Sequence, residues 1–264
     1  MSDLFCGVDA GAAATKVVLV DPSGGVVGSS VRRSGVDFTS TARRNLEDAL
    51  AQAGAARDAI RRTVSTGYGR TNVDFADETM TEIACHATAV HHAFPRPVTV
   101  VDIGGQDSKV IRIDADGRRV NFKMNRKCAA GTGAFLEEIG LRLDVELTEL
   151  DRLAHEASDP VSLGSFCTVF TKTEVLGLIR QGRRIEDIAH GVYDSVAKRI
   201  LEMDPLTGEV VMTGGVVEHN PMVATLLSSR IGRQVHVLER AQLAGAHGAA
   251  LRAIGGGAKE KTDA

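Results

Sequence analysis

The sequence is poor in aromatic residues. Phe, Trp and Tyr together make up 4% of the 264 residues, and Trp is absent. Proteins that bind single-stranded nucleic acids stack the bases on aromatic rings, so this composition argues against that class. A basic excess is also missing, because 31 Lys and Arg stand against 34 Asp and Glu. Since nucleic-acid binders usually carry surplus positive charge, we expect no nucleic-acid partner.

Long hydrophobic runs are missing as well. No stretch approaches the ~18 apolar residues of a membrane-spanning helix, and residues 1–6 show no basic segment followed by an apolar one. We therefore expect a cytoplasmic protein without a membrane partner. The 4 cysteines are too few and too dispersed for a disulfide framework. In a reducing compartment they are interpreted as free thiols or metal ligands.

Small residues are abundant by contrast. The chain has 28 Gly, gathered in a few short clusters, with 43% hydrophobic and 25% charged residues. These fractions are ordinary for a soluble globular protein, and the length predicts one large or two small domains at about 150 residues each. Glycine clusters in such a chain are typical of proteins whose backbone approaches phosphate groups.

The most informative feature is an internal repeat. Residues 9–24 (DAGAAATKVVLVDPSG) match residues 102–117 (DIGGQDSKVIRIDADG) without a gap. The repeat pairs Asp9 with Asp102, Gly11 with Gly104, Thr15 with Ser108, Lys16 with Lys109, Asp21 with Asp114 and Gly24 with Gly117. Each copy predicts a strand, an Asp-x-Gly turn, a β-branched strand, a polar turn and a third strand. We interpret the chain as a duplication of a β-meander.

The predicted elements follow the repeat. The strands are expected at Leu4–Val8, Val17–Val20 and Val26–Val31, then at Val98–Val101, Val110–Ile113, Arg118–Met124 and Val210–Met212. Helical spacing predicts helices at Thr39–Gln52, Gly133–Ile139, Leu147–His155, Phe170–Ile179, Ile185–Ile200 and Leu243–Ile254. Ser40 or Thr41 is expected to cap the first helix and Gly54 to end it, while a cap centred on Thr148 precedes the third.

A proline pair divides the chain. Pro95 and Pro97 break regular structure between the two copies. We therefore predict a first domain over residues 1–95 and a second over 96–242. The helix at residues 243–254 is expected to pack back on the first domain.

The two Asp-x-Gly turns predict phosphate binding. Glycine leaves backbone N–H groups unshielded for a phosphate, and the aspartates Asp9 and Asp102 can hold Mg²⁺ through water. Lys16 and Lys109 either contact phosphate or are solvated strand ends. Gln106 is our candidate for positioning the attacking water, its alternative being a side chain that stabilises the turn. An ordinary hairpin remains the alternative for each turn.

With Thr213-Gly214-Gly215 after a later strand, the order of motifs resembles the actin, Hsp70 and sugar-kinase ATPase superfamily. The resemblance implies an α/β fold with two ribonuclease-H-like domains around an ATP cleft. It implies that both turns bind phosphates and Mg²⁺ and that the later glycines approach the adenosine. The candidate nucleotide-binding residues are Gly11, Ala12, Ala13, Thr15, Lys16, Gly104, Gly105, Asp107, Gly214, Gly215, Val216, Asn220, Gln242 and Gly245. For Asn220 and its neighbour His219, a plain turn before Pro221 is the alternative.

Two cysteines precede predicted helices. Cys128 and Cys167 each stand near a helix start, where the partial positive charge favours thiolates. The alternative is that both are small buried hydrophobic residues. Two thiolates cannot complete the Cys₄ shell of a [4Fe–4S] cluster, and Cys6 and Cys85 lie in a separate strand and helical stretch. A two-fold dimer would supply the missing pair.

The same segments carry a closer resemblance. VDIGGQDSK (101–109), MNRKCAAGTGAFLE (124–137), CTVF (167–170), TGGV (213–216) and QLAGAHGAAL (242–251) are similar to the BadF/BadG/BcrA/BcrD ATPase family. That family comprises 2-hydroxyacyl-CoA dehydratase activators and benzoyl-CoA reductase ATPase subunits. The resemblance implies a homodimer bridged by one [4Fe–4S] cluster on Cys128 and Cys167. It implies ATP hydrolysis driving a low-potential electron, supplied by ferredoxin or flavodoxin, to an iron–sulfur partner enzyme under anaerobic conditions.

Two departures from the family pattern stand out. Ala12-Ala13-Ala14 occupies positions where family members usually have hydroxyl residues, so ATP is expected either to bind more weakly or to depend more on backbone contacts. Arg126 stands where many members have an acidic residue, which puts positive charge beside the expected cluster; it would either raise the cluster potential or change the docking surface.

Two other functions stay open from the residues alone. One is a small-molecule kinase of the same superfamily, with Asp107 as the base toward a sugar hydroxyl. The other is a nucleotide-dependent binding module without enzymatic activity, in the manner of a filament or chaperone ATPase domain. A metal site at Cys85, His86, His91 and His92 is disfavoured, because these residues do not converge on one helix face, and a solvated helical surface is expected instead.

Overall fold

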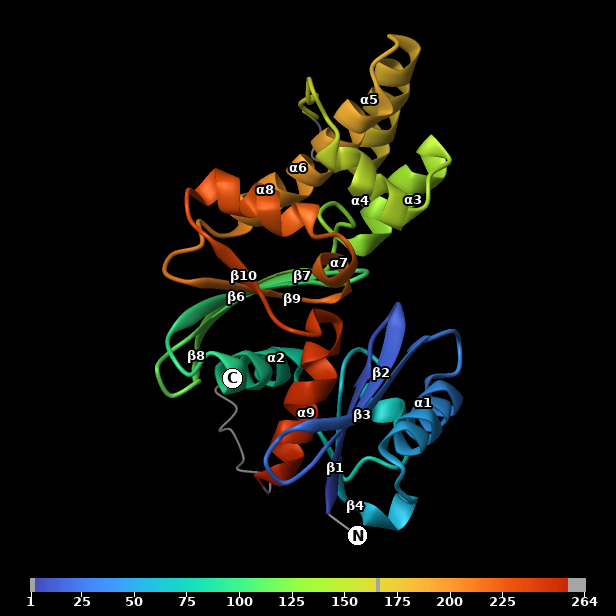
Figure 1. Cartoon of the computed structure of the whole chain (residues 1–264), viewed down its shortest axis with the longest axis vertical. Coiled ribbons are helices and arrows are strands. Elements are labelled where there is room, and N and C mark those ends of the chain that lie inside the picture. The colour runs from blue at the N-terminus through green and yellow to red at the C-terminus, as the bar shows by residue number, and fades with distance from the viewer. Residues whose placement is uncertain (1–2, 165–166, 256–264) are drawn as a thin grey trace. The chain divides into compact units, whose positions relative to one another are not determined.

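The computed structural model describes residues 3–164 and 167–255 (Figure 1). The chain divides into two compact units. The described residues up to Pro95, together with those from Leu243 onward, form unit 1, and Arg96–Gln242 form unit 2. Each unit contains one 5-stranded sheet.

Unit 1 is built on a meander extended by two parallel strands. The strands are β1 (Leu4–Ala10), β2 (Ala14–Val20), β3 (Val26–Arg33), β4 (Ile60–Thr66) and β5 (Glu78–Thr79). They are ordered β3-β2-β1-β4-β5, with β1, β2 and β3 antiparallel and β4 parallel to both β1 and β5. The β-branched and apolar sequence of β1 and β2 suits strands that are covered on both faces.

Helices cover both faces of this sheet. They are α1 (Phe38–Ala53), α2 (Glu82–Ala93) and α9 (Ala244–Ile254), with short 3₁₀ turns η1 (Arg57–Ala59) and η2 (Arg70–Asn72). Successive residues of β2 belong to different cores. Val17 and Leu19 pack with α1, whereas Val18 and Val20 pack with α9. The period of two along the strand therefore assigns each side chain to one helical layer.

Helix α9 lies unusually close to its neighbours. A Cβ at Gly7 would come within 1.9 Å of the Ala246 carbonyl oxygen, and one at Gly248 within 1.8 Å of the Cys85 carbonyl oxygen. Only glycine permits these approaches, because any larger residue would overlap backbone atoms. The Gly- and Ala-rich sequence of α9 thus lets the helix fit between β1 and α2.

Unit 2 repeats the topology of unit 1. Its strands are β6 (Val98–Ile103), β7 (Ser108–Ile113), β8 (Arg119–Asn125), β9 (Val210–Thr213) and β10 (Val235–Val237). Their order is β10-β9-β6-β7-β8, with an antiparallel β6-β7-β8 meander and parallel β6-β9 and β9-β10 pairs. The predicted duplication of a β-meander is therefore confirmed at the level of the whole sheet.

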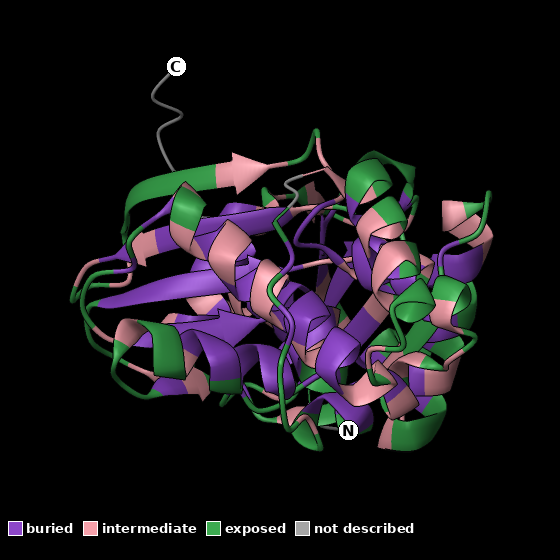
Figure 2. Cartoon of the chain, turned by 90° about the horizontal axis from the view of Figure 1, so that it is seen from above, coloured by how far each residue is buried: buried purple, intermediate pink, exposed green. Residues whose placement is uncertain are grey.

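The helices of unit 2 form its main core with one face of the sheet. They are α3 (Gly133–Leu143), α4 (Leu147–His155), α5 (Thr168–Arg180), α6 (Ile185–Met203), α7 (Gly215–His219) and α8 (Met222–Ile231), followed by η3 (Ala241–Leu243). Val101, Ile103 and Met212 from the sheet pack with Leu136, Leu150 and Val192 from the helices. Figure 2 shows the central strands largely as buried.

Several local predictions need correction. Asp37, rather than Ser40 or Thr41, caps α1, its carboxylate accepting a hydrogen bond from the Ser40 N–H at 2.9 Å. The predicted stop at Gly54 is confirmed by its left-handed backbone. Helix α3 continues through Gly140 to Leu143, and Glu146 rather than Thr148 occupies the N-cap of α4. Strands β4, β5 and β10 were not anticipated, because they are short or rich in polar residues.

No helix within the described ranges is both long and apolar enough to cross a membrane.

Candidate functional site

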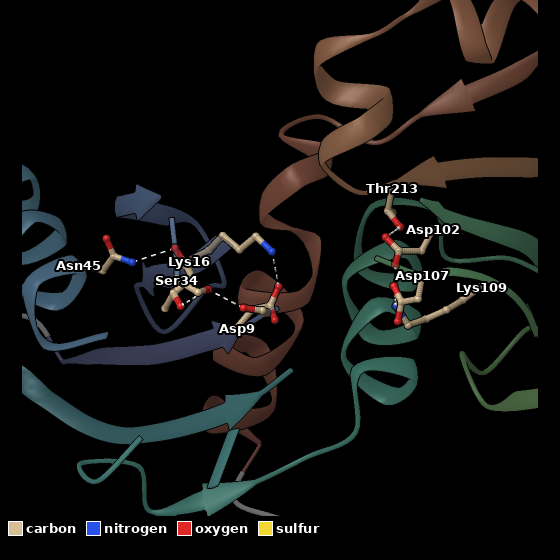
Figure 3. A network of polar contacts seen from close by, with 10 residues as sticks. Asp9, Lys16, Ser34, Asn45, Asp102, Asp107, Lys109 and Thr213 are labelled. Atoms are coloured by element: carbon tan, nitrogen blue, oxygen red, sulfur yellow. Dashed lines mark hydrogen bonds and ion pairs between the residues drawn. The ribbon is translucent and has the colours of Figure 1, made fainter. Parts of the chain in front are cut away.

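In unit 1 an aspartate and a lysine face each other across the first hairpin. Asp9 on β1 is the register partner of Lys16 on β2, and the Lys16 Nζ donates to Asp9 Oδ2 at 2.9 Å (Figure 3). Asp9 is buried and the Lys16 side chain is 15% exposed. Lys16 is therefore not the solvated strand end that formed its alternative interpretation.

The turn between these strands presents its backbone to solvent. Ala12 and Ala13 are exposed, and the Gly11 N–H donates to the Ala14 carbonyl at 3.1 Å. Ser34 fixes this turn from β3's end, because its hydroxyl donates to the Gly11 carbonyl and its N–H donates to that of Ala13. The Thr15 hydroxyl is buried and shares a hydrogen bond with Ser34. Thr15 thus supports the turn from inside.

Two glycines lie close to the Asp9 carboxylate: Gly245, which the sequence singled out, and Gly67, which it did not. Gly67, which follows β4 with φ +93°, has no room for a Cβ: it would meet Asp9 Oδ1 at 2.5 Å. On another side of the carboxylate, a Cβ at Gly245 would lie 3.1 Å from Asp9 Oδ2 and 3.3 Å from His86 Nε2. Gly245 therefore lets the start of α9 approach Asp9 and His86 in unit 1. Gly67 and Ser34 carried no signal because neither falls in the repeated segment.

Unit 2 holds a more deeply buried copy of the same pair. Lys109, 2% exposed, donates to Asp102 Oδ2 at 3.1 Å and to Asp107 Oδ1 at 2.8 Å. The second oxygen of Asp102 accepts a hydrogen bond from the Thr213 hydroxyl at 3.0 Å (Figure 3). The interpretation of Lys109 as a solvated strand end is wrong, because its ammonium group is enclosed by two carboxylates.

The second glycine turn is bound to the start of α3. The Gly133 N–H donates to the Gly104 carbonyl at 2.9 Å, and the Ala134 N–H donates to the Gly105 carbonyl at 2.8 Å. These donors belong to the first turn of the helix, whose N–H groups have no partner within the helix. The turn that resembles a phosphate loop is therefore held directly by the helix that follows Cys128.

Gln106 lies exposed at the tip of this turn. Among the residues that the structure describes, its side-chain amide makes no hydrogen bond to the turn. The turn is closed instead by the Gly104 N–H, which donates to the Asp107 carbonyl at 2.9 Å. The alternative role of Gln106 as a turn stabiliser thus finds no contact here, and its amide is available to a ligand.

The glycine pair after β9 is also required by geometry. Gly214 has φ +101°, and a Cβ there would meet the Ile103 carbonyl oxygen at 2.3 Å. Gly215 starts α7, and a Cβ on it would lie 3.3 Å from Gln242 Nε2. The Gln242 side chain is oriented by His219, the two side chains forming a hydrogen bond of 3.0 Å. Gly215 and Gln242 are thereby brought together within unit 2.

Asn220 has a structural position. Its amide donates to the Val216 carbonyl at 2.8 Å and accepts a hydrogen bond from the buried Tyr193 hydroxyl at 2.7 Å. Both polar ends of the side chain are thus satisfied inside the protein, and Val216 is itself buried. The turn before Pro221, which was the alternative for Asn220, describes this geometry better than a direct contact with the adenosine.

Cys128 and Cys167 differ from the other two cysteines in exposure. Both are half-buried, Cys128 in the loop before α3 and Cys167 at the N-cap of α5. The Asn125 side chain holds the first loop, since its amide donates to the Cys128 carbonyl at 3.0 Å and accepts from the Cys128 N–H at 3.3 Å. The alternative interpretation, in which Cys128 and Cys167 are small buried hydrophobic residues, therefore does not describe either thiol.

Cys6 and Cys85 are completely buried in unit 1. Burial raises the pKa of both thiols to about 12, so they remain protonated and chemically quiet. His86 is also buried, which contradicts the expected solvated helical surface at that part of α2. Within the described part of the chain, no group of three or more His, Cys, Asp or Glu residues has the spacing of a metal site.

Comparison with known proteins identifies the family. The model of the BadF/BadG/BcrA/BcrD ATPase family matches residues 6–253. The 2-hydroxyisocaproyl-CoA dehydratase activator of Clostridioides difficile is 40% identical over 251 residues, which cover 94% of each chain. The two sheets, with their paired hairpins, define an ATPase fold of the actin, Hsp70 and sugar-kinase type. Within that class, the chain belongs to the BadF/BadG/BcrA/BcrD ATPase family.

Solved structures agree with this assignment. Component A of the Acidaminococcus fermentans (R)-2-hydroxyglutaryl-CoA dehydratase superposes with a TM-score of 0.92 at 37% identity, covering 98% of this chain and 100% of that one. The Clostridium difficile activator with bound ADPNP gives 0.89 at 38% identity, covering 97% and 95%. A ROK-family glucokinase from Streptomyces griseus gives 0.58 at 14% identity, a likeness that concerns the fold alone.

The duplicated ion pairs predict unequal costs of removing the lysine. Lys109→Met leaves Asp102 and Asp107 without a cation in a buried site, and we expect a loss of about 3–5 kcal/mol in the free energy of unfolding. Lys16→Met, at the more exposed copy, should cost less. Urea unfolding followed by circular dichroism compares the two variants. Equal losses, or a larger loss for Lys16→Met, would contradict the burial argument.

Proposed function

We propose that this protein couples ATP hydrolysis to the delivery of a low-potential electron. Its partner would be an iron–sulfur enzyme of the 2-hydroxyacyl-CoA dehydratase or benzoyl-CoA reductase type. The observation that carries the proposal is the pair of hydrogen bonds between the Gly104–Gly105 turn and the start of α3. This contact joins a candidate nucleotide turn to the helix directly after Cys128, so one rigid segment links the two chemistries.

The nucleotide part of the proposal rests on the two hairpins. Both Asp-x-Gly turns would bind the phosphates of one ATP through backbone N–H groups, with Asp9 and Asp102 near Mg²⁺ through water. The exposed backbone of Ala12 and Ala13 supports binding through the main chain. Gly215 and Gln242 would contact the adenosine together. Their closeness within unit 2 supports a shared role. Gln106 would orient the attacking water.

A [4Fe–4S] cluster fits the chemistry of the two half-buried thiols. Thiolates are the usual ligands of such clusters, and Cys167 lies at the N-cap of α5, where negative charge is stabilised. When bound, the cluster would accept and donate one electron. Because Cys6 and Cys85 are enclosed in the core of unit 1, a second copy of this chain is the natural source of the other two ligands.

The surface of α5 supports this homodimer. Val169, Phe170 and Leu176 are exposed, with Thr173 and Gly177 between them, so an apolar face with small residues starts next to Cys167. Such a face allows close packing of a second helix. Only Thr171 and Val175 of this helix are buried in its own unit. Contact between two α5 helices would cover the exposed face and bring two Cys167 residues toward one axis.

Residues of this chain provide a route for coupling the two sites. A shift of the Gly104–Gly105 turn on ATP binding would pull the N-terminus of α3 through its hydrogen bonds to Gly133 and Ala134. Helix α3 is tied in turn to α5 by the ion pair of Glu138 with Lys172 at 2.6 Å. These contacts connect the turn to both segments that carry the cysteines. The connected segments would form the element with two arrangements that such coupling needs.

The kinase alternative has less support. The Asp107 carboxylate, its candidate base, is tied to the Lys109 ammonium at 2.8 Å, which competes with the acceptance of a substrate proton. A kinase would also leave Cys128 and Cys167 without a role. We further propose a cytoplasmic location and a ferredoxin or flavodoxin as electron donor, since both follow from the family resemblance.

Iron analysis tests the cluster directly. Protein purified without oxygen is expected to contain four iron and four sulfide per dimer. One [4Fe–4S] cluster takes four thiolates, and each copy of the chain supplies two of them. Cys128→Ser and Cys167→Ser should lose the iron and the dimer together. Cys6→Ala, which removes a thiol from the core of unit 1, is the matched control and should keep both. A colourless, iron-free wild-type preparation would refute the proposal.

A charge on the exposed face of α5 should prevent dimer formation. In Phe170→Glu a carboxylate would have to be desolvated at the helix contact, so sedimentation should show a monomer with little iron. Val36→Glu changes an apolar residue that is fully exposed in unit 1 and should leave the dimer intact. A dimeric, iron-replete Phe170→Glu protein would place the contact elsewhere.

Gln106→Ala should slow ATP hydrolysis by about a hundredfold while nucleotide binding persists, because the group that orients water is lost. Steady-state hydrolysis and equilibrium nucleotide binding measure the two effects separately. Asp116→Asn, in the exposed turn between β7 and β8, serves as the control. Unchanged turnover in Gln106→Ala would remove this residue from the mechanism.

A further inference from the structure

Arg199 lies against the loop that carries Cys128. Arg199 belongs to α6, and a Cβ built on Gly131 would come within 3.1 Å of its Cβ and 3.0 Å of its Cγ. Gly131 also has φ +81°, so glycine is required there both by conformation and by contact. This packing places the Arg199 side chain beside the loop that carries Cys128, three residues before Gly131 in the chain.

A cavity of about 290 Å³ adjoins this contact. Ala130 and Gly131 from the Cys128 loop, Thr171 from α5, and Lys198, Arg199 and Glu202 from α6 contribute to its lining. The cavity is thus bordered by both segments that carry the proposed cluster ligands.

The Arg199 guanidinium is paired with Glu202 on the same helix. Its Nη1 donates to Glu202 Oε2 at 2.7 Å, and both side chains are only partly exposed. The pKa of Arg199 is raised, chiefly by the hydrogen bond to Glu202 and further by Cys128. The neighbouring Lys198 is directed elsewhere, to the Ser162 hydroxyl at 3.1 Å and to Asp194 at 3.1 Å. These two adjacent cations in one cavity wall therefore differ in their surroundings, because Arg199 packs against the Cys128 loop and Lys198 is bound to Ser162 and Asp194.

We propose that Arg199 is a positioning residue that raises the reduction potential of the cluster by holding a fixed positive charge beside the loop that carries Cys128. The proposal rests on the proposed function, because it takes Cys128 as a cluster ligand. Hydrogen bonds to cluster sulfurs and nearby charge set such potentials. Arginine keeps its charge at all working pH values, and a cation favours the reduced state, which carries one more negative charge.

Glu202 opposes this effect. Its carboxylate accepts a hydrogen bond from Arg199 and offsets part of the guanidinium charge, so the potential would depend on both side chains. In a two-fold dimer each copy contributes one such pair, and the cluster senses two. The balance between the Arg199 and Glu202 charges would thereby determine how strongly reducing the protein is when it is loaded.

The test is a redox titration of the loaded, oxygen-free protein followed by electron paramagnetic resonance. Arg199→Gln is expected to lower the equilibrium constant for reduction of the cluster at least tenfold, which is a fall of about 59 mV in the potential of a one-electron couple. Glu202→Gln should shift the potential in the opposite direction. Lys198→Gln, the matched control in the same cavity wall, should leave it unchanged, and Arg199→Lys should restore part of the wild-type value.

The outcomes separate this inference from the function on which it rests. Wild-type protein without iron and sulfide refutes the proposed function before Arg199 is considered. A wild-type cluster whose potential is the same in Arg199→Gln, or a Lys198→Gln shift as large as that of Arg199→Gln, overturns the inference alone. Should Arg199→Gln lose its cluster, Glu202→Gln decides: a raised potential supports the role of Arg199, and an unchanged or lowered one refutes it.

Discussion

The structure depends on one interaction that occurs twice, an aspartate on the first strand of a meander bound to a lysine on the second. The two partners are placed opposite each other by antiparallel register, Asp9 with Lys16 and Asp102 with Lys109. A buried carboxylate is costly unless a cation or hydrogen-bond donors accompany it. The pair therefore permits an acidic group to stand at the end of a fully buried strand, beside a glycine turn whose backbone is open to solvent.

The two copies have diverged around this common feature. In unit 2 each oxygen of the Asp102 carboxylate accepts a hydrogen bond, one from Lys109 and one from Thr213, and Asp107 adds a second anion for the lysine. In unit 1 the surroundings of Asp9 are formed by close glycine contacts, at Gly67 and Gly245, rather than by a second acid. Similar sheets thus present two different electrostatic environments, and the glycine turn of the second is joined to the helix that follows Cys128.

The sequence allowed the meanders, the duplication and the family to be predicted, because these depend on local alternation and on motifs with fixed spacing. Features created by tertiary contact were not predictable. Asp37 was overlooked as a cap since Ser40 and Thr41 are equally good capping residues by type. The burial of Cys85 and His86 follows from the approach of α9, which is distant in the chain. Asn220 fits an adenosine pocket by position but is held by Tyr193, which no nearby pattern indicates.

The same limit applied to the candidate site. The repeat singled out Lys109, but the second carboxylate at Asp107 and the depth of burial emerged only from the fold. Arg199 attracted no attention, since nothing in the residues around it distinguishes it from Lys198. Its position becomes informative only through Gly131, which lets this α6 side chain approach a loop that lies far earlier in the chain.

Helix α5 has a thermodynamic consequence of its own. It spans 13 residues, about the length at which an isolated helix is marginal in water, and it buries only Thr171 and Val175. Local opening of this segment therefore costs less free energy than opening the sheets, and its amide hydrogens exchange with solvent through a separate, low-energy fluctuation. In the proposed dimer, the order of the segment that begins at Cys167 would depend on the surface that covers its outer side, so folding of this helix and assembly would be linked by mass action.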